Sequence, residues 1–399
     1  MKIKYFTFIS ILFFIITPLL TFAQDELDTT KIKQDISVKK DSLEIIKVNL
    51  ELSKPVEEVD SSENVGVKII GYPYAFYSPE TKLAIGLGGL LYFRTSTSPD
   101  IKPSKLQVAA YYTINNQYYF AARPSIYFPG KDELYFEGDF NFGEEIRQFY
   151  GVGNNTPDIE NSEYKMKFWG FSAELAAEDL IIGNSRQGLI YEYSNNTIID
   201  KLSNPNFADS GLTGLETKVV AGLGFSLSFD HRDNIFYSSS GYYLKLSGVF
   251  YGDPFGSAYS FDKYIIDFRN FWSPFDSHIL AFQVYSNLTL GNPPFFKLPQ
   301  IGGSYRMRGF LEGRYIDRQY FVTQFEYRKI IWWRLGVALF YSYGDVSDKI
   351  GNFRLKEFKH SWGAGLRFVF DEAEKINIRV DFGFAEGTTG VYFALDEAF

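Results

Sequence analysis

The sequence predicts an all-β fold: a 16-stranded antiparallel transmembrane β-barrel of the outer membrane. Three observations predict it. About sixteen segments alternate apolar and polar residues with a period of two, the connections between them are sorted into short and long ones, and the chain opens with an export signal. Aromatic residues, which strands favour over long exposed helices, make up 19% of the chain and support the same class.

The first 23 residues have the pattern of a signal peptide. Lys2 and Lys4 precede an almost wholly apolar run, and Ala23 supplies a small residue at the expected cleavage point. The run is short for a spanning helix, which disfavours a membrane anchor. The chain contains no cysteine, which excludes a lipid attached to a signal-peptide cysteine, a disulfide framework and a Cys-ligated metal.

Residues 24–65 differ in composition from everything that follows. They are rich in Lys, Asp, Glu and Ser and nearly free of aromatic residues, as expected for a charged periplasmic N-terminal segment with little fixed structure. Such a segment is short for a folded accessory domain. The barrel is therefore predicted to occupy residues 66–399.

A period of two dominates the predicted barrel. From Ile376 to Phe384 the even-numbered residues are apolar, whereas Asn377, Arg379 and Asp381 are polar. In a soluble sandwich the polar face would meet water, and in a membrane barrel the apolar face would meet lipid. Many segments match the about 9–11 residues that cross a bilayer at a tilt. The predicted strands lie near 67–77, 81–94, 104–115, 117–129, 132–142, 163–178, 182–193, 217–230, 240–251, 257–272, 277–289, 320–332, 334–346, 358–370, 375–384 and 390–399.

The connections between these strands separate a membrane barrel from a soluble sandwich. If the first strand runs outward, the periplasmic turns include the short stretches 129–132, 273–276 and 371–374. The outer loops include the long stretches 143–162, 194–216 and 290–319. Short turns on one side and long loops on the other are typical of transmembrane barrels.

The last strand carries a further signal. Val391, Phe393, Leu395 and Phe399 are predicted to share one apolar face. An aromatic residue at the end of an amphipathic strand is what the bacterial barrel-assembly machinery recognises, so this machinery is an expected partner during biogenesis. The same residues border the predicted lateral seam between the first and last strands.

The sequence offers no catalytic constellation. His231, His278 and His360 lack metal-ligand spacing, and no G-x-S-x-G nucleophile motif is present. The glycines near Gly86 and Gly222 do not open a helix, so they do not form a dinucleotide site. We therefore expect no enzyme activity, no cofactor and no metal. A net charge of −8 argues against a nucleic-acid partner.

The stretch Met307-Arg308-Gly309-Phe310, preceded by Ile301-Gly302-Gly303, resembles the sixth extracellular loop of the bacterial surface antigen superfamily, the outer-membrane assembly factors of the BamA/TamA type. Four other stretches share the resemblance: Phe325-Glu326-Tyr327-Arg328, Phe229-Asp230-His231-Arg232-Asp233-Asn234 with Gly241, Phe149-Tyr150-Gly151-Val152-Gly153-Asn154, and Gly363-Ala364-Gly365-Leu366-Arg367. Because residues 24–65 are too few for a POTRA domain, the chain looks like a stand-alone member that lacks these domains.

The resemblance implies a lumen plug. In such proteins this loop folds into the barrel, and its arginine, here Arg308, pairs with acidic residues on the inner wall. The period of two places Glu326 on that wall as the first expected partner. The second expected partner position is occupied by Ser342 where the family carries an aspartate, which predicts a looser plug.

The resemblance also implies a function. The barrel would assist insertion or translocation of proteins or lipids at the outer membrane of a Gram-negative cell. A gated or passive pore is an alternative, and so is a structural accessory barrel that binds a periplasmic partner through residues 24–65. Expected partners are outer-membrane lipid, lipopolysaccharide and a periplasmic or outer-membrane protein.

Overall fold

A computed structural model of the chain describes residues 67–78, 82–96, 101, 103–130, 134–159, 162–208, 211–372 and 375–399. The predicted signal peptide and the charged segment lie outside these described residues. Residues 63–399 form one compact unit, which contains every strand found among the described residues. Among the described residues, no helix is both long and apolar enough to cross a membrane.

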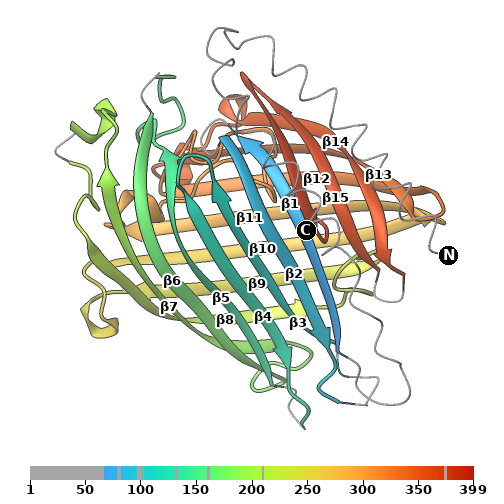
Figure 1. Ribbon diagram of the computed structural model, residues 1–399. Helices are drawn as coiled ribbons and strands as arrows, with labels where there is room; N and C mark the ends of the chain where they lie inside the picture. Colours follow the sequence, from blue (N-terminus) through green and yellow to red (C-terminus); the bar gives the residue numbers. More distant parts are fainter. Residues whose placement is uncertain are drawn as a thin grey trace, which may run out of the picture. The chain divides into compact units, whose positions relative to one another are not determined.

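Sixteen strands and five short 3₁₀ helices make up the described fold (Figure 1). The strands are β1 (Lys68–Ser78), β2 (Lys82–Phe93), β3 (Ser104–Thr113), β4 (Tyr118–Tyr127), β5 (Tyr135–Gln148), β6 (Glu163–Glu178), β7 (Arg186–Asp200), β8 (Lys218–Asp230), β9 (Gly241–Tyr251), β10 (Phe261–Phe275), β11 (His278–Gly291), β12 (Gln319–Trp332), β13 (Leu335–Ser347), β14 (Lys359–Asp371), β15 (Ile376–Ala385) and β16 (Thr388–Leu395). The 3₁₀ helices are η2 (Pro205–Ala208), η3 (Asp253–Phe255), η4 (Phe295–Lys297), η5 (Ile350–Asn352) and η6 (Leu355–Glu357).

The sheet follows the chain without a crossover. Each strand pairs antiparallel with the next, in the order β1 to β16. Within the described residues, no strand register joins β1 to β16. The two strands nevertheless meet, because the rings of Tyr72 in β1 and Phe393 in β16 lie 5.9 Å apart. Figure 1 shows the sheet curling until β1, in blue, comes beside the strands drawn in red.

The two faces of the sheet are the reverse of those in a soluble protein. On β12, the outward ring of Phe325 is 53% exposed, whereas Glu326 is 2% exposed and Arg328 is fully buried. Phe225 and Trp362 on other strands are also largely exposed. A soluble sandwich would expose its charged face to water and bury its aromatic face. The observed pattern fits a sheet with lipid on its apolar face and an enclosed polar face.

Each of the sixteen predicted strands corresponds to an observed one, with differences at their ends. β5 continues to Gln148 and β7 to Asp200, into stretches predicted as loops. These extensions are polar, which is unfavourable for a strand by propensity alone. Both extensions pair with β6, and Lys165 of β6 forms a 2.6 Å ion pair with Glu144 in the β5 extension. The predicted turn at 273–276 is also shorter, because β10 continues to Phe275.

The prediction for the end of the chain is wrong in one respect. β16 ends at Leu395, so Phe399 does not share a strand face with Val391 and Phe393. The latter two are exposed on the outer face, whereas Phe399 is buried against Phe271 and Ala281 on the inner face.

The physical reason for this ending lies in the residues that follow β16. Asp396 has a φ of 84°, which breaks the strand. The next carboxylate, Glu397, accepts hydrogen bonds from Arg367 at 2.8 Å and Asn377 at 2.9 Å. These bonds direct the last residues toward the inner face.

Candidate functional site

The loop between β11 and β12, residues 292–318, lies against the inner face of the sheet. Met307 and Phe310 are buried in one cluster with Tyr285 and Tyr320 of the neighbouring strands. Between them, Gly309 has a φ of 116°, a conformation that favours glycine. Its main-chain N–H donates to the Tyr392 hydroxyl at 2.9 Å, and its carbonyl accepts from Thr388 at 2.7 Å. The loop is thereby bonded to the last strand, β16.

Arg308 carries the polar contact between this loop and the wall. Its two terminal nitrogens donate to Glu326 of β12 and Asp381 of β15, each at 2.5 Å. The guanidinium also lies 3.6 Å from the ring centroid of Phe340, in a cation–π arrangement. Arg308 is fully buried, so these charge-assisted bonds form away from water. A single side chain thus ties the loop to two strands that are not neighbours in the sheet.

Arg308 belongs to a larger buried ion network. Its members are four arginines, Arg308, Arg328, Arg367 and Arg379, and three carboxylates, Glu326, Asp381 and Glu397. None of the seven side chains is more than 2% exposed. Buried ions are tolerated when their partners compensate them, so each side chain constrains the positions of the others.

The register of the sheet explains how the loop can come so close to the wall. Glu326 pairs with Phe340, Phe340 with Gly363, and Gly363 with Gly383, which gives one row across β12 to β15. The two glycines leave a depression in this row. The Phe340 ring lies over Gly363, and the backbone of Arg308 lies over Gly383. A Cβ on Gly383 would stand 2.6 Å from the carbonyl carbon of Arg308.

Replacing Gly383 with alanine should therefore displace the loop while leaving β15 intact. The obstructing atom is main chain, which cannot rotate away as a side chain would. We expect Gly383→Ala to make residues 302–317 accessible to proteinase K in the folded protein, with the cleavage mapped by mass spectrometry. Gly71→Ala in β1 is the matched control, since a Cβ there has no neighbour within 4 Å. Equal protection of the loop in both variants would contradict this interpretation.

Comparison with known proteins identifies the family to which the chain belongs. Residues 104–397 match the Omp85 superfamily domain. The chain belongs to the Omp85 superfamily. No curated protein matches the sequence.

The solved structures similar to this chain include two bacterial proteins. BamA from Haemophilus ducreyi lacking POTRA domains 1–3 has a TM-score of 0.52 and 12% identity, and the match covers 83% of this chain and 69% of that one. Wzi, an outer-membrane protein of Escherichia coli involved in group 1 capsule assembly and a carbohydrate-binding β-barrel, has a TM-score of 0.30 and 12% identity, with 83% and 81% covered. The first likeness identifies the fold as a BamA-like barrel, and the superfamily places it in the outer membrane. The second is too weak to carry an argument.

The loop 292–318 contacts one of the two predicted partners, Glu326, directly and the other, Ser342, only through a third side chain. Glu326 contacts Arg308, as described above. Ser342 instead donates to the side-chain oxygen of Gln324 at 2.9 Å. Gln324 in turn donates to the carbonyl of Tyr305 at 3.0 Å and accepts from the N–H of Met307 at 3.3 Å. Ser342 is thus no partner of Arg308 but orients an amide that holds the loop backbone.

The second carboxylate on Arg308 is Asp381, which sequence reasoning did not assign. Alternation had placed Arg379 and Asp381 on the polar face of their strand. Alternation alone could not predict that Asp381 of β15 and Glu326 of β12 would both reach Arg308. Their relative positions depend on the register of three strand pairs, from β12 to β15. Asp381 on β15, two strands further on, therefore supplies the second carboxylate in place of the aspartate that β13 lacks.

The loop contains one basic group with a shifted pKa, the half-buried Lys297. Burial, together with the nearby cations Lys263 and Arg147, lowers the pKa of Lys297 to about 8. This shift favours the neutral form, as desolvation requires.

The turn between β8 and β9 also reaches the inner side of the seam. Arg232 forms two bonds to Asp230 at 2.8 and 2.9 Å, and the Asn234 side chain accepts from the N–H of Phe236 at 2.8 Å. The turn so fixed presents Phe236, which is buried in one cluster with residues of β1, β2, β15 and β16. These partners are Ile70, Tyr72, Leu90, Tyr92, Ile376, Ile378 and Leu395. A turn from the middle of the strand order therefore packs against both ends of the sheet.

Proposed function

We propose that this chain assists insertion or translocation of proteins or lipids at the outer membrane by opening between β1 and β16. In this proposal the loop 292–318 is a lumen plug that is coupled to the opening strand. The role agrees with membership of the Omp85 superfamily, and the client proteins or lipids are the cargo. Barrel-assembly machinery is the expected partner during biogenesis.

One observation carries the proposal: among the described residues no strand register joins β1 to β16, and the docked loop is bonded to β16. Strands joined by a full ladder of backbone bonds resist separation, whereas Tyr72 and Phe393 meet through apolar packing. Movement of the loop would act on β16 through the Tyr392 and Thr388 hydroxyls. Plug position and seam opening would then be coupled.

Locking the seam tests the proposal. Tyr72→Cys with Phe393→Cys, joined by a short reducible thiol crosslinker, should abolish client delivery in living cells. Reduction should restore it. The measurement is the protein and lipid composition of the outer membrane before and after reduction. The native chain has no cysteine, so the crosslinker acts only at the introduced pair.

A matched control removes the effect of crosslinking itself. Val380→Cys with Phe393→Cys joins β15 to β16, which are already paired at these positions. This crosslink should leave delivery unchanged. If the locked seam delivers as well as the control, opening between β1 and β16 is not part of the function.

A gated pore is the second candidate function, and the charged inner face of the sheet favours it. Deleting residues 302–317 separates the two. A pore should then conduct steadily across a planar bilayer while outer-membrane composition stays unchanged. An insertion or translocation factor should lose delivery instead.

A further inference from the structure

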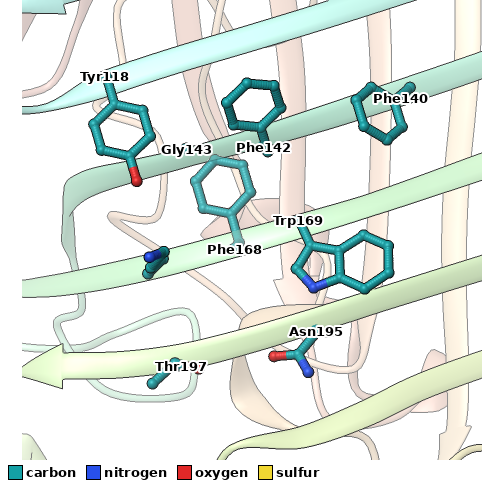
Figure 2. Close-up of a pocket in the computed structure, with 9 residues that line it drawn as sticks. Tyr118, Phe140, Phe142, Gly143, Phe168, Trp169, Asn195 and Thr197 are labelled. Carbon is teal, nitrogen blue, oxygen red and sulfur yellow. The ribbon is translucent and has the colours of Figure 1, made fainter.

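A groove lies on the outer face of β4 to β7, away from the strands β1 and β16 that border the seam. It has a volume of about 570 Å³, within the range typical of ligand sites. Figure 2 shows the side chains of Tyr118, Phe140, Phe142, Trp169 and Asn195 around it, projecting from four successive strands. Gly143 forms part of the floor.

Strand register divides this groove into an apolar and a polar half. One row of paired residues runs Phe120, Phe142, Trp169 and Asn195. The neighbouring row on the same face runs Tyr118, Glu144, Lys167 and Thr197. The second row is nearer the loop that connects β5 to β6. Because that is the side of the long loops, the polar half lies toward the outside of the cell in the proposed membrane orientation.

Lys167 supplies the charge of the polar half. The Glu144 opposite it is bonded to Lys165 at 2.6 Å. This leaves the Lys167 ammonium without an ion-pair partner in the part of the chain that the structure describes. A cation at the membrane surface beside an amide and hydroxyl groups suits a ligand with a phosphate and sugar hydroxyls.

We propose that this groove binds a phosphorylated glycolipid of the outer leaflet. Lys167 contacts the phosphate, Asn195 and Thr197 contact the sugar, and the rings of Trp169, Phe140 and Phe142 contact the sugar face and the first acyl carbons. Aromatic side chains at the membrane interface accept such a ligand because one end of the site is apolar and the other is wet. The inference rests on the proposed membrane orientation, which it extends by naming a lipid class and its site.

Native mass spectrometry of the purified full-length protein in detergent tests this binding directly. The probes are lipid A, phosphatidylglycerol and phosphatidylethanolamine, each added at the same concentration. We expect lipid A to remain bound in preference to both phospholipids. Lys167→Gln should weaken lipid A binding about tenfold or more, and Trp169→Leu should weaken it less.

The matched control is Lys329→Gln, which removes a lysine from β12 on the same strand face as the exposed Phe325. Because Lys329 does not line the groove, its loss should leave lipid A binding within about twofold. Unheated electrophoretic mobility confirms that each variant is folded. Equal binding of all three lipids, or equal effects of the two lysine variants, would overturn the proposal. Since this assay contains no client, its failure is distinct from failure of the seam-locking experiment.

Discussion

Arg308→Ala is expected to release the loop 292–318 from the wall while the barrel stays folded. The substitution removes two charge-assisted bonds, to Glu326 and Asp381, and the stacking on Phe340. Hydrogen bonds to charged groups are worth about 1.5–3 kcal/mol each, so docking should weaken by several kcal/mol. The wall itself keeps three arginines and three carboxylates and therefore remains balanced in formal charge.

Protease protection measures this release. Residues 302–317 should become sensitive to proteinase K in Arg308→Ala, whereas the strands stay protected. Arg306→Ala is the matched control on the same loop, because Arg306 contacts the Tyr285 ring and forms no ion pair among the described residues. Arg308→Lys should give an intermediate result, since an ammonium lacks the planar fork that reaches two carboxylates. A protected loop in Arg308→Ala would show that the ion pairs do not hold it.

Asp381→Asn is expected to damage the barrel itself, more than any change in the loop. Asp381 accepts bonds from Arg308, Arg367 and Arg379, at 2.5, 2.6 and 2.5 Å. Its neutralisation would leave four buried arginines with two carboxylates. Breaking a buried ion pair by removing one partner costs on the order of 3–5 kcal/mol. The variant should therefore refold poorly, and its urea midpoint in lipid vesicles should fall markedly.

Asp139→Asn is the comparison that isolates burial. Asp139 also faces inward and pairs with Arg123 at 2.7 Å, but both side chains are more than a third exposed. Exposed pairs contribute about 0–1 kcal/mol, so this variant should unfold near the parent midpoint. Similar midpoints for the two variants would mean that the buried network adds no more than a surface ion pair.

The strand content of this fold could be predicted because a period of two is a local property. The alternation around Glu326 and Asp381 fixes which side chains face inward without any knowledge of the neighbours. The Arg308–Glu326 contact could be predicted in the same way, since an arginine in a loop that folds inward needs an acidic partner on the inner face of the sheet.

The remaining features depend on geometry that no local pattern encodes. Asp381 reaches Arg308 only because two glycine positions, Gly363 and Gly383, come into line across separate strands. The polar ends of β5 and β7 are strands because β6, the strand with which both pair, is long. The strand propensity of a residue contains no information about the length of its partner strand. The inward course of Phe399 follows from the bonds of Glu397 to residues far away in the sequence.

Because Phe399 is buried in the folded chain, another protein can recognise this side chain only before folding is complete. In the folded chain it is 5% exposed, packs on Phe271 and Ala281, and its main-chain oxygen accepts from Arg328 at 2.9 Å. A receptor that recognises this ring can therefore bind only chains that have not finished folding. Completed barrels would not compete with newly exported ones for that receptor. Accessibility of the Phe399 ring thus distinguishes unfolded from folded copies of this chain.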